Sequence, residues 1–221
     1  MIVFVAGPPT GSDLYALAAV GGKPIAITFS PVSESGPALG PSGDAVAFLR
    51  SAALSDSTAA SVWVLNLATG AERKIELPAS AGAPERVGWT ADGRRLVVRA
   101  GGRLYRADAA ADGASPVIGA ERAAAESALA VLLGEPVFAE VVSCATPNDL
   151  CVRNADGRIT PLARGAADPA RWGSDSVAYL EGDRLVVRPV GPGRPRSVNW
   201  TGVPERPRQL SVFPGSTSEP R

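Results

Sequence analysis

The sequence contains no histidine among its 221 residues. A Ser-His-Asp triad, a Cys-His pair and every histidine-ligated metal site are therefore excluded. A P-loop, a nucleophile elbow, a dinucleotide-binding glycine motif and a calcium loop are also missing, and lysine occurs only at Lys23 and Lys74. The carboxylates stand singly at predicted turns, where they serve the local backbone. We therefore predict that the protein is not an enzyme and has no catalytic residues, no metal site and no cofactor.

Net charge and long apolar runs are lacking too. Lys and Arg together number 22, as do Asp and Glu, so no overall positive charge favours nucleic acid or an anionic membrane. No run approaches the roughly 18 apolar residues that a membrane-spanning helix needs. The apolar segment 1–6 is short and has no basic residues before it, which indicates a strand rather than a signal peptide. We predict no nucleic-acid partner, no membrane insertion, and either a cytoplasmic chain or one whose upstream segment is missing.

Cysteine occurs only at Cys144 and Cys151. The six residues between them include Pro147, Asn148 and Asp149, which favour a turn between two apolar runs. Such a turn can bring the two sulfur atoms together across a hairpin, so Cys144–Cys151 is a candidate disulfide. The alternative is a pair of buried free thiols. A disulfide would indicate an oxidising compartment.

The sequence does contain an internal repeat. Short apolar segments recur every 35–48 residues, at 13–18, 61–66, 103–108, 149–154 and 184–189, and the first three have an aromatic residue near the middle. Each is preceded by another apolar run and followed by a glycine-containing turn and a further short run. Hairpins of four short strands that repeat at about 40–45 residues are typical of a β-propeller.

The fold class that we predict is all-β, a five-bladed β-propeller of four-stranded antiparallel blades. The fifth leading strand is found at the C-terminal end, so we expect the segment around Phe213 to join the N-terminal blade beside Phe4 and close the ring. Residues 1–221 form one domain on this prediction. Its blades are residues 1–30 with 205–216, 36–78, 84–119, 126–164 and 168–200. The alternative is an open propeller, or a six-bladed one that has lost a blade.

One segment departs from the strand pattern. Residues 121–133 are rich in alanine and have apolar residues at helical spacing. We expect a short helix there, ahead of the fourth blade.

Two repeats resemble those of a known family. The segments 41–48 and 90–98, each followed by an aromatic strand and a glycine turn, are similar to the Ser-Pro-Asp-Gly repeat of TolB-like propellers, which are related to WD40-type repeats. The fourth and fifth repeats keep only the strand-turn-strand frame. The resemblance implies a bacterial, usually exported propeller that contacts proteins or is attached to another domain. It implies no activity, because propellers support many unrelated functions.

The strongest local charge bias lies at residues 184–208, which hold six arginines against Glu205. Arg and Trp are enriched where proteins bind one another, and proline stiffens this segment. The candidate binding residues are Arg194, Arg196, Trp200, Arg206 and Arg208. The alternative is a solvated edge with Trp200 packed between blades. Residues 51–60, small and polar, form a weaker candidate loop.

These observations predict a non-enzymatic binding or scaffold propeller of the bacterial envelope that contacts a protein or a small ligand through loops on one face and through its central opening. The alternative is an accessory propeller module of a larger enzyme or sensor, such as a hydrolase or a receptor kinase. A third option is a small enzyme acting at the channel mouth. We expect a monomer with a protein partner, located in the periplasm or outside the cell if an upstream signal exists.

Overall fold

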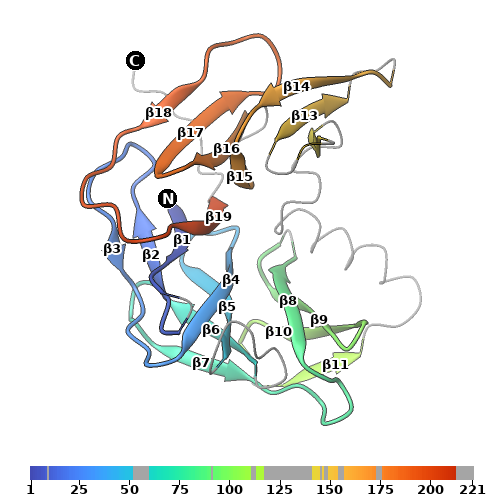
Figure 1. Cartoon of the computed structure of the whole chain (residues 1–221). Helices are drawn as coiled ribbons and strands as arrows, with labels where there is room; N and C mark the ends of the chain where they lie inside the picture. Colours follow the sequence, from blue (N-terminus) through green and yellow to red (C-terminus); the bar gives the residue numbers. More distant parts are fainter. Residues whose placement is uncertain are drawn as a thin grey trace.

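A computed structural model describes residues 1–8, 10–51, 60–90, 92–110, 113–116, 141–144, 146, 149–153, 157–172 and 176–212. The described residues contain β-strands and no helix, and the strands form five separate antiparallel sheets (Figure 1). The helix expected at 121–133 and most of the loop 51–60 lie outside the described residues.

Four of the sheets have four strands, and the sheet of β12–β14 has three among the described residues. The first sheet has the order β19 (Arg208–Val212), β1 (Ile2–Ala6), β2 (Asp13–Leu17) and β3 (Ile25–Ala26). The second is β4 (Ser33–Leu39), β5 (Ala45–Ser51), β6 (Ser61–Asn66) and β7 (Glu72–Ile75). The third is β8 (Pro84–Trp89), β9 (Arg95–Ala100), β10 (Arg103–Asp108) and β11 (Ala114–Pro116). The fourth is β12 (Val141–Ser143), β13 (Leu150–Arg153) and β14 (Ile159–Ala163), and the fifth is β15 (Ala166–Trp172), β16 (Ser176–Glu181), β17 (Arg184–Pro189) and β18 (Arg196–Val198).

The second strand of a sheet is the most deeply buried. Every residue of β1 is buried, and the middles of β5, β9 and β16 are buried on both faces. Their Val, Leu, Phe and Tyr side chains suit a pleated strand, and burial on both faces explains why polar and apolar residues do not alternate along them. The last strands, β3, β7, β11 and β18, carry more exposed residues because they lie at the outer edge.

Neighbouring sheets share apolar clusters. One cluster joins the second and third sheets around Trp89, and another joins the first and second around Phe48. The cluster around Phe4 joins the fifth and first sheets. The cluster around Tyr179 joins the fourth and fifth sheets. The sheets therefore follow one another face to face in the order fourth, fifth, first, second, third. No such cluster joins the third and fourth sheets among the described residues, and residues 117–140, which connect them, lie outside those residues.

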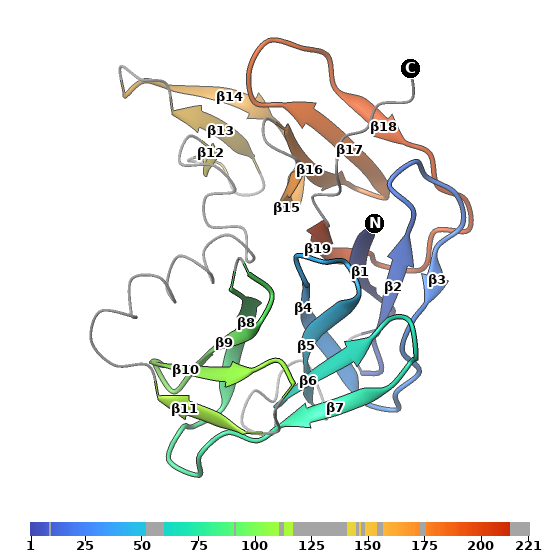
Figure 2. The ribbon, with the colours of Figure 1, turned by 180° about the vertical axis from the view of Figure 1, so that it is seen from behind.

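The first sheet contains both ends of the described chain. Strand β19 pairs antiparallel with β1, with Ile2 opposite Val212 and Val5 opposite Arg208 (Figures 1 and 2). This is the head-to-tail pairing expected from the repeat, although Phe213 itself lies outside the described residues. The C-terminal strand thereby covers an edge of β1 that would otherwise be unpaired.

Two sheets begin earlier than the sequence predicts. Strand β4 starts at Ser33 rather than near residue 36, and β15 starts at Ala166 rather than near residue 168. In both strands a proline follows within four residues, and a proline predicts a break in a regular strand. Here each strand continues through its proline by means of a β-bulge.

A buried ionic network links the first two sheets. Glu34 is fully buried, and its carboxylate accepts hydrogen bonds from Thr28 Oγ1 and from Arg50, whose Nη2 lies 2.6 Å from Oε1. Arg50 also binds Glu72 at 2.9 Å and stacks 4.5 Å from the ring centroid of Trp63. Burial raises the pKa of Glu34, while the hydrogen bonds from Thr28 and Arg50 act in the opposite direction. The buried charge of Glu34 is tolerated because Thr28 and Arg50 satisfy its carboxylate oxygens.

Cys144 and Cys151 are joined by a disulfide, with their Cα atoms 5.4 Å apart. The main-chain N–H of Cys144 donates to the carbonyl of Asp149 at 3.0 Å, so the loop between β12 and β13 closes beside the bond. The described residues contain no helix that is long and apolar enough to cross a membrane.

Candidate functional site

The strands nearest the middle of the molecule share an irregularity. In four sheets the register shifts with the extra residue on the inner strand: on β4 between Ser35 and Ala38, on β8 between Pro84 and Arg86, on β15 between Ala167 and Ala170, and on β19 opposite Val3 to Val5. In the described part of the fourth sheet the shift lies on the outer strand β14 instead. A β-bulge of this kind bends the strand and redirects its side chains. The inner-strand bulge thus recurs in four of the five sheets.

In three of these bulges one residue adopts the left-handed backbone conformation. The φ angles are 58° at Gly36, 51° at Asp168 and 53° at Gln209. Glycine takes this conformation freely and aspartate tolerates it better than most residues, whereas glutamine does not. Non-glycine residues held in this region are found most often at functional sites, because the surrounding structure must offset the strain.

Hydrogen bonds connect the bulges across sheets. Gln209 Oε1 accepts from the main-chain N–H of Gly36 at 2.8 Å, and Ser211 Oγ accepts from that of Leu39 at 3.0 Å. The Asp168 carboxylate in turn accepts from the main-chain N–H of Gln209. These bonds satisfy inner-edge donors that have no strand beside them. They also tie the first, second and fifth sheets together at the centre.

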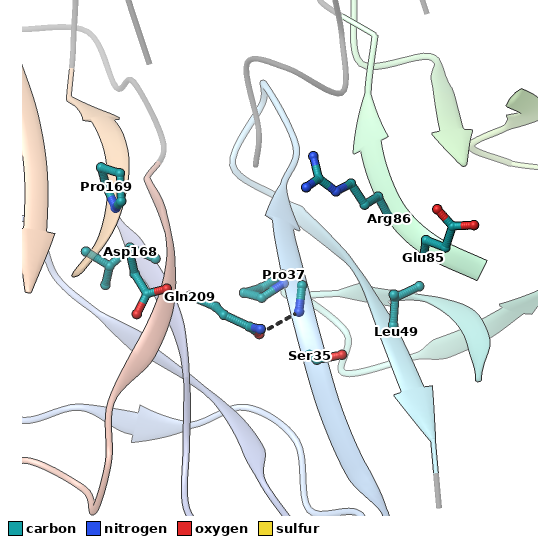
Figure 3. Close-up of a pocket in the computed structure, with 10 residues that line it drawn as sticks. Ser35, Pro37, Leu49, Glu85, Arg86, Asp168, Pro169 and Gln209 are labelled. Carbon is teal, nitrogen blue, oxygen red and sulfur yellow. Dashed lines mark hydrogen bonds between the residues drawn. The ribbon is translucent and has the colours of Figure 1, made fainter. Parts of the chain in front are cut away.

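A cavity of about 360 Å³ lies between the bulges (Figure 3). Its polar side chains come from Asp168 and Gln209 on one side and from Glu85 and Arg86 on β8 on the other. The remaining lining residues are Ser35, Gly36, Pro37, Leu49, Pro169 and Leu210. Residues from all four bulged strands therefore meet at one opening.

The charges around the opening are partly removed from water. Burial raises the pKa of Asp168, against the opposing effects of the Gln209 N–H and of the nearby Arg208 charge. Burial also lowers the pKa of Arg208, whose Nη1 donates to the carbonyls of Gly7 and Arg206 at 3.1 and 3.2 Å. Arg208 Nη2 is buried and has no hydrogen-bond partner among the described residues.

The arrangement is suited to binding. It offers the carboxylates of Asp168 and Glu85, the Gln209 amide, the Arg86 guanidinium and the Ser35 hydroxyl on a rigid frame of paired strands. A frame of this kind holds a polar ligand or an extended peptide with little loss of entropy. The described residues contain no cluster of three or more acidic or cysteine side chains that could hold a metal ion.

The residues predicted from the basic segment do not gather at this opening. Arg194 is exposed in the turn before β18, and Arg196 stacks 5.1 Å from the ring centroid of Trp172. Trp200 packs edge-on against Phe4, with ring centroids 5.3 Å apart, and its Nε1 donates to the Asp183 carbonyl at 2.8 Å. Trp200 thus lies between the fifth and first sheets, which is the packing alternative considered from the sequence.

The other two candidates lie at the junction of the chain ends. Arg206 has a φ of 54° and lies 3.5 Å from the Glu205 carboxylate on the surface. Arg208 donates to the main-chain carbonyl of Gly7, and the Gly7 N–H donates to the main-chain carbonyl of Glu205 at 2.7 Å. These contacts fasten the N-terminal hairpin to β19.

Sequence reasoning missed Asp168, Gln209 and Glu85. Two signals were present, because Gly36-Pro37 and Asp168-Pro169 both place a proline directly after a glycine or an aspartate. Proline within a strand indicates an edge or a bulge, and glycine or aspartate before it supports a left-handed residue. No such signal marks Gln209, since glutamine has no preference for this conformation.

The sequence matches no protein-family model, and no curated protein matches it. Among solved structures the chain is similar to TolB from Acinetobacter baumannii, with 14% identity over 95% of this chain and 65% of that one and a TM-score of 0.41. It is similar to a putative TolB from Agrobacterium tumefaciens at 11% identity, over 86% and 57% of the chains, with a TM-score of 0.39. It is also similar to a chain of a nidogen/laminin complex, with 14% identity over 96% of this chain and 82% of that one and a TM-score of 0.42.

This chain spans less than two thirds of both TolB chains. Similarity to TolB and to other β-propeller proteins is thus found in structure as well as in the repeat sequence. Because the TM-scores lie below 0.5, the description of the fold depends on the sheets themselves.

Proposed function

We propose that the chain is a five-bladed β-propeller of the bacterial envelope that binds a protein segment or a small polar ligand at its central opening and performs no catalysis. The five sheets, their face-to-face order and the pairing of β19 with β1 support the five-bladed ring. Closure between the third and fourth sheets is part of the proposal.

The observation that carries the binding function is the cavity between the four bulges. The bulges on β4, β8, β15 and β19 cost ladder hydrogen bonds, and the left-handed Asp168 and Gln209 add strain. Packing alone does not require these costs, because a regular inner strand would pair better. The bulges turn exposed and half-buried polar groups toward the cavity. A regular strand would direct these hydrogen-bonding groups elsewhere, so a binding function accounts for the bulges.

Site-specific photo-crosslinking tests this proposal. A photo-reactive amino acid replaces Glu85, which is exposed and lines the cavity, and the matched control replaces Ser115, which is exposed on the outer strand β11. Intact protein is irradiated in an extract of bacterial envelope proteins. We expect discrete adducts at Glu85 that are absent at Ser115 and that decrease in an Asp168→Asn, Arg86→Gln background. Equal labelling at both positions, or no adduct at either, would overturn the binding role of the opening.

The envelope location rests on the Cys144–Cys151 bond. Disulfides persist in oxidising compartments and are rare in the reducing cytosol. Denatured, unreduced protein isolated from its native host should therefore contain no titratable thiol, while the reduced sample should contain both. Two thiols in the unreduced sample would contradict the location and leave the binding proposal at the opening intact.

A further inference from the structure

A second cavity, of about 280 Å³, lies on the face of the fifth sheet that is turned toward the fourth sheet. Cross-strand pairs place its side chains together, because Glu181 is opposite Arg184, Tyr179 is opposite Val186, and Val186 is opposite Ser197. Residues directly opposite one another project from the same face of a sheet. Glu181, Arg184, Tyr179 and Ser197 therefore share one face, as does Arg188, two residues beyond Val186.

The lining of this cavity is strongly basic. Arg164, Arg184 and Arg188 contribute their charges to it, and Glu181 is the one acidic residue among its described lining residues. Arg196 also lines the cavity, but its guanidinium lies over Trp172, toward the other face of the sheet. Arg164 lies in the turn between β14 and β15 and makes no ion pair with any described residue. The like charges of guanidinium groups that line one cavity repel one another, so an anion bound among them would be stabilised.

Tyr179 lines the cavity and is almost fully buried. Its side chain is 3% exposed, and its oxygen accepts a hydrogen bond from Arg188. Burial raises the pKa of Tyr179, so the phenol stays protonated at neutral pH. Because the oxygen accepts from Arg188, the O–H hydrogen remains available to a ligand.

Arg184 is held in place from two sides. Its Nη1 lies 3.1 Å from the Glu181 carboxylate, and its Nη2 donates to Ser197 Oγ at 2.9 Å. A guanidinium fixed in this way loses little entropy when it binds an anion. The cavity thus has one oriented cation, one buried hydroxyl donor and further arginines around them.

We propose that this cavity is a binding site for a small dianion of the phosphate-monoester class. Arg164, Arg184 and Arg188 outnumber the one acidic group, Glu181, by two, which favours two negative charges over one. Arginine forks match the oxygens of phosphate, and the volume lies below the roughly 300 Å³ at which sites for drug-sized ligands begin. The site shares no lining residue with the central opening and is independent of the function proposed there.

Calorimetric titration of the intact, disulfide-bonded chain with inorganic phosphate at low salt tests the site. We expect saturable binding that falls about tenfold in Arg188→Gln and at least about threefold in Tyr179→Phe, as hydrogen bonds to a charged ligand are removed. The matched control is Arg194→Gln, which removes an exposed arginine outside the lining and should change the affinity by less than about twofold. Arg164→Gln, in an exposed turn, should weaken binding and decides the matter if Arg188→Gln does not fold.

Two further arms define the ligand and its source. Acetate should bind much more weakly than phosphate, and equal affinity for the two would overturn the dianion assignment. Glycerol 3-phosphate and vesicles of phosphatidylcholine containing phosphatidic acid are compared next. Binding of the soluble ester alone supports a metabolite, and binding of the vesicles as well supports a lipid headgroup. No binding of phosphate or of either ester, or equal weakening by Arg194→Gln, would overturn the proposal.

Discussion

Asp168 shows how one residue can serve two requirements at the central opening. Its backbone is left-handed, which the bulge needs, and its carboxylate faces the cavity (Figure 3). Asparagine tolerates the same backbone conformation and keeps the shape of the side chain, but it cannot ionise. The Asp168→Asn variant therefore separates the charge from the conformation.

We predict that Asp168→Asn stabilises the protein at pH 7 and has a smaller effect near pH 3.5. Since burial raises the folded-state pKa of Asp168, its contribution to stability is present below the unfolded pKa of about 3.9 and is lost as the pH rises through the folded value. Urea unfolding of both proteins at the two pH values measures the difference. Asp183→Asn, at an exposed position, is the control. A difference that does not change with pH would contradict the assignment to the Asp168 charge.

At the scale of elements, contacts between sheets are specified by single backbone positions. Gly21 has a φ of 98°, and a Cβ placed there would lie 2.0 Å from the carbonyl oxygen of Asn199. The neighbouring Gly22 has a φ of 121° and open space around its missing Cβ, while its N–H donates to the same carbonyl at 2.8 Å. An alanine at Gly22 would therefore suffer backbone strain alone, whereas an alanine at Gly21 would suffer both backbone strain and a steric clash.

We predict that Gly21→Ala lowers the free energy of unfolding by about 3 kcal/mol or more, because strain and clash add. Gly22→Ala should cost about 1–2 kcal/mol, from its left-handed backbone alone. Chemical denaturation of both variants gives the comparison. If both variants lost the same free energy of unfolding, the backbone at Gly21 would not approach Asn199 as closely as the structure shows.

The buried network of Glu34 and Arg50 gives a second test at this scale. Arg50→Met should cost about 3–5 kcal/mol, because the carboxylate of Glu34 would stay buried without its cation. Lys74→Met breaks an exposed pair with Glu76 and should change stability by less than about 0.5 kcal/mol. Urea unfolding measures both, and adding Glu34→Gln to Arg50→Met should recover part of the loss. If the free-energy losses of Arg50→Met and Glu34→Gln simply added in the double variant, Glu34 and Arg50 would not be energetically coupled.

The hairpin elements could be predicted from the sequence, but the inner irregularities could not. Apolar runs around Phe48, Trp63 and Tyr105, separated by glycine turns, specify strands and turns locally, and these strands are present. The packing role of Trp200 could not be predicted locally, because its ring contacts Phe4, which is distant in the sequence. The candidate site depends on Gln209 bonding to Gly36, a contact across most of the chain for which no local pattern exists. The basic cavity likewise requires the register of β16, β17 and β18.

At the scale of the whole molecule, the C-terminal strand determines whether the first sheet is complete. Strand β19 pairs with β1, and its side chains Gln209 and Ser211 bond to the main chain of β4. Leu210, 6% exposed, packs in the cluster between the fifth and first sheets. One short strand therefore contacts three sheets.

We predict that truncation after Pro207 removes cooperative unfolding and causes aggregation, because β1 would then present an open apolar edge. Urea unfolding and size-exclusion chromatography follow the two effects. A synthetic peptide with the sequence of 205–216 should restore the monomer peak in proportion to its concentration, and the same residues in scrambled order should not. A truncated chain with the unfolding midpoint of the full one would contradict the role of β19.

The shared sheet also has a consequence for how the protein is made. Strand β1 leaves the ribosome before its partner β19, which is synthesised about two hundred residues later. At a usual rate of about 5–20 residues per second, β1 waits at least about ten seconds for that partner. During this interval the nascent chain holds an incomplete sheet that a chaperone or an export factor could recognise. Delayed completion of this kind would keep the polypeptide translocation-competent until β19 has been synthesised.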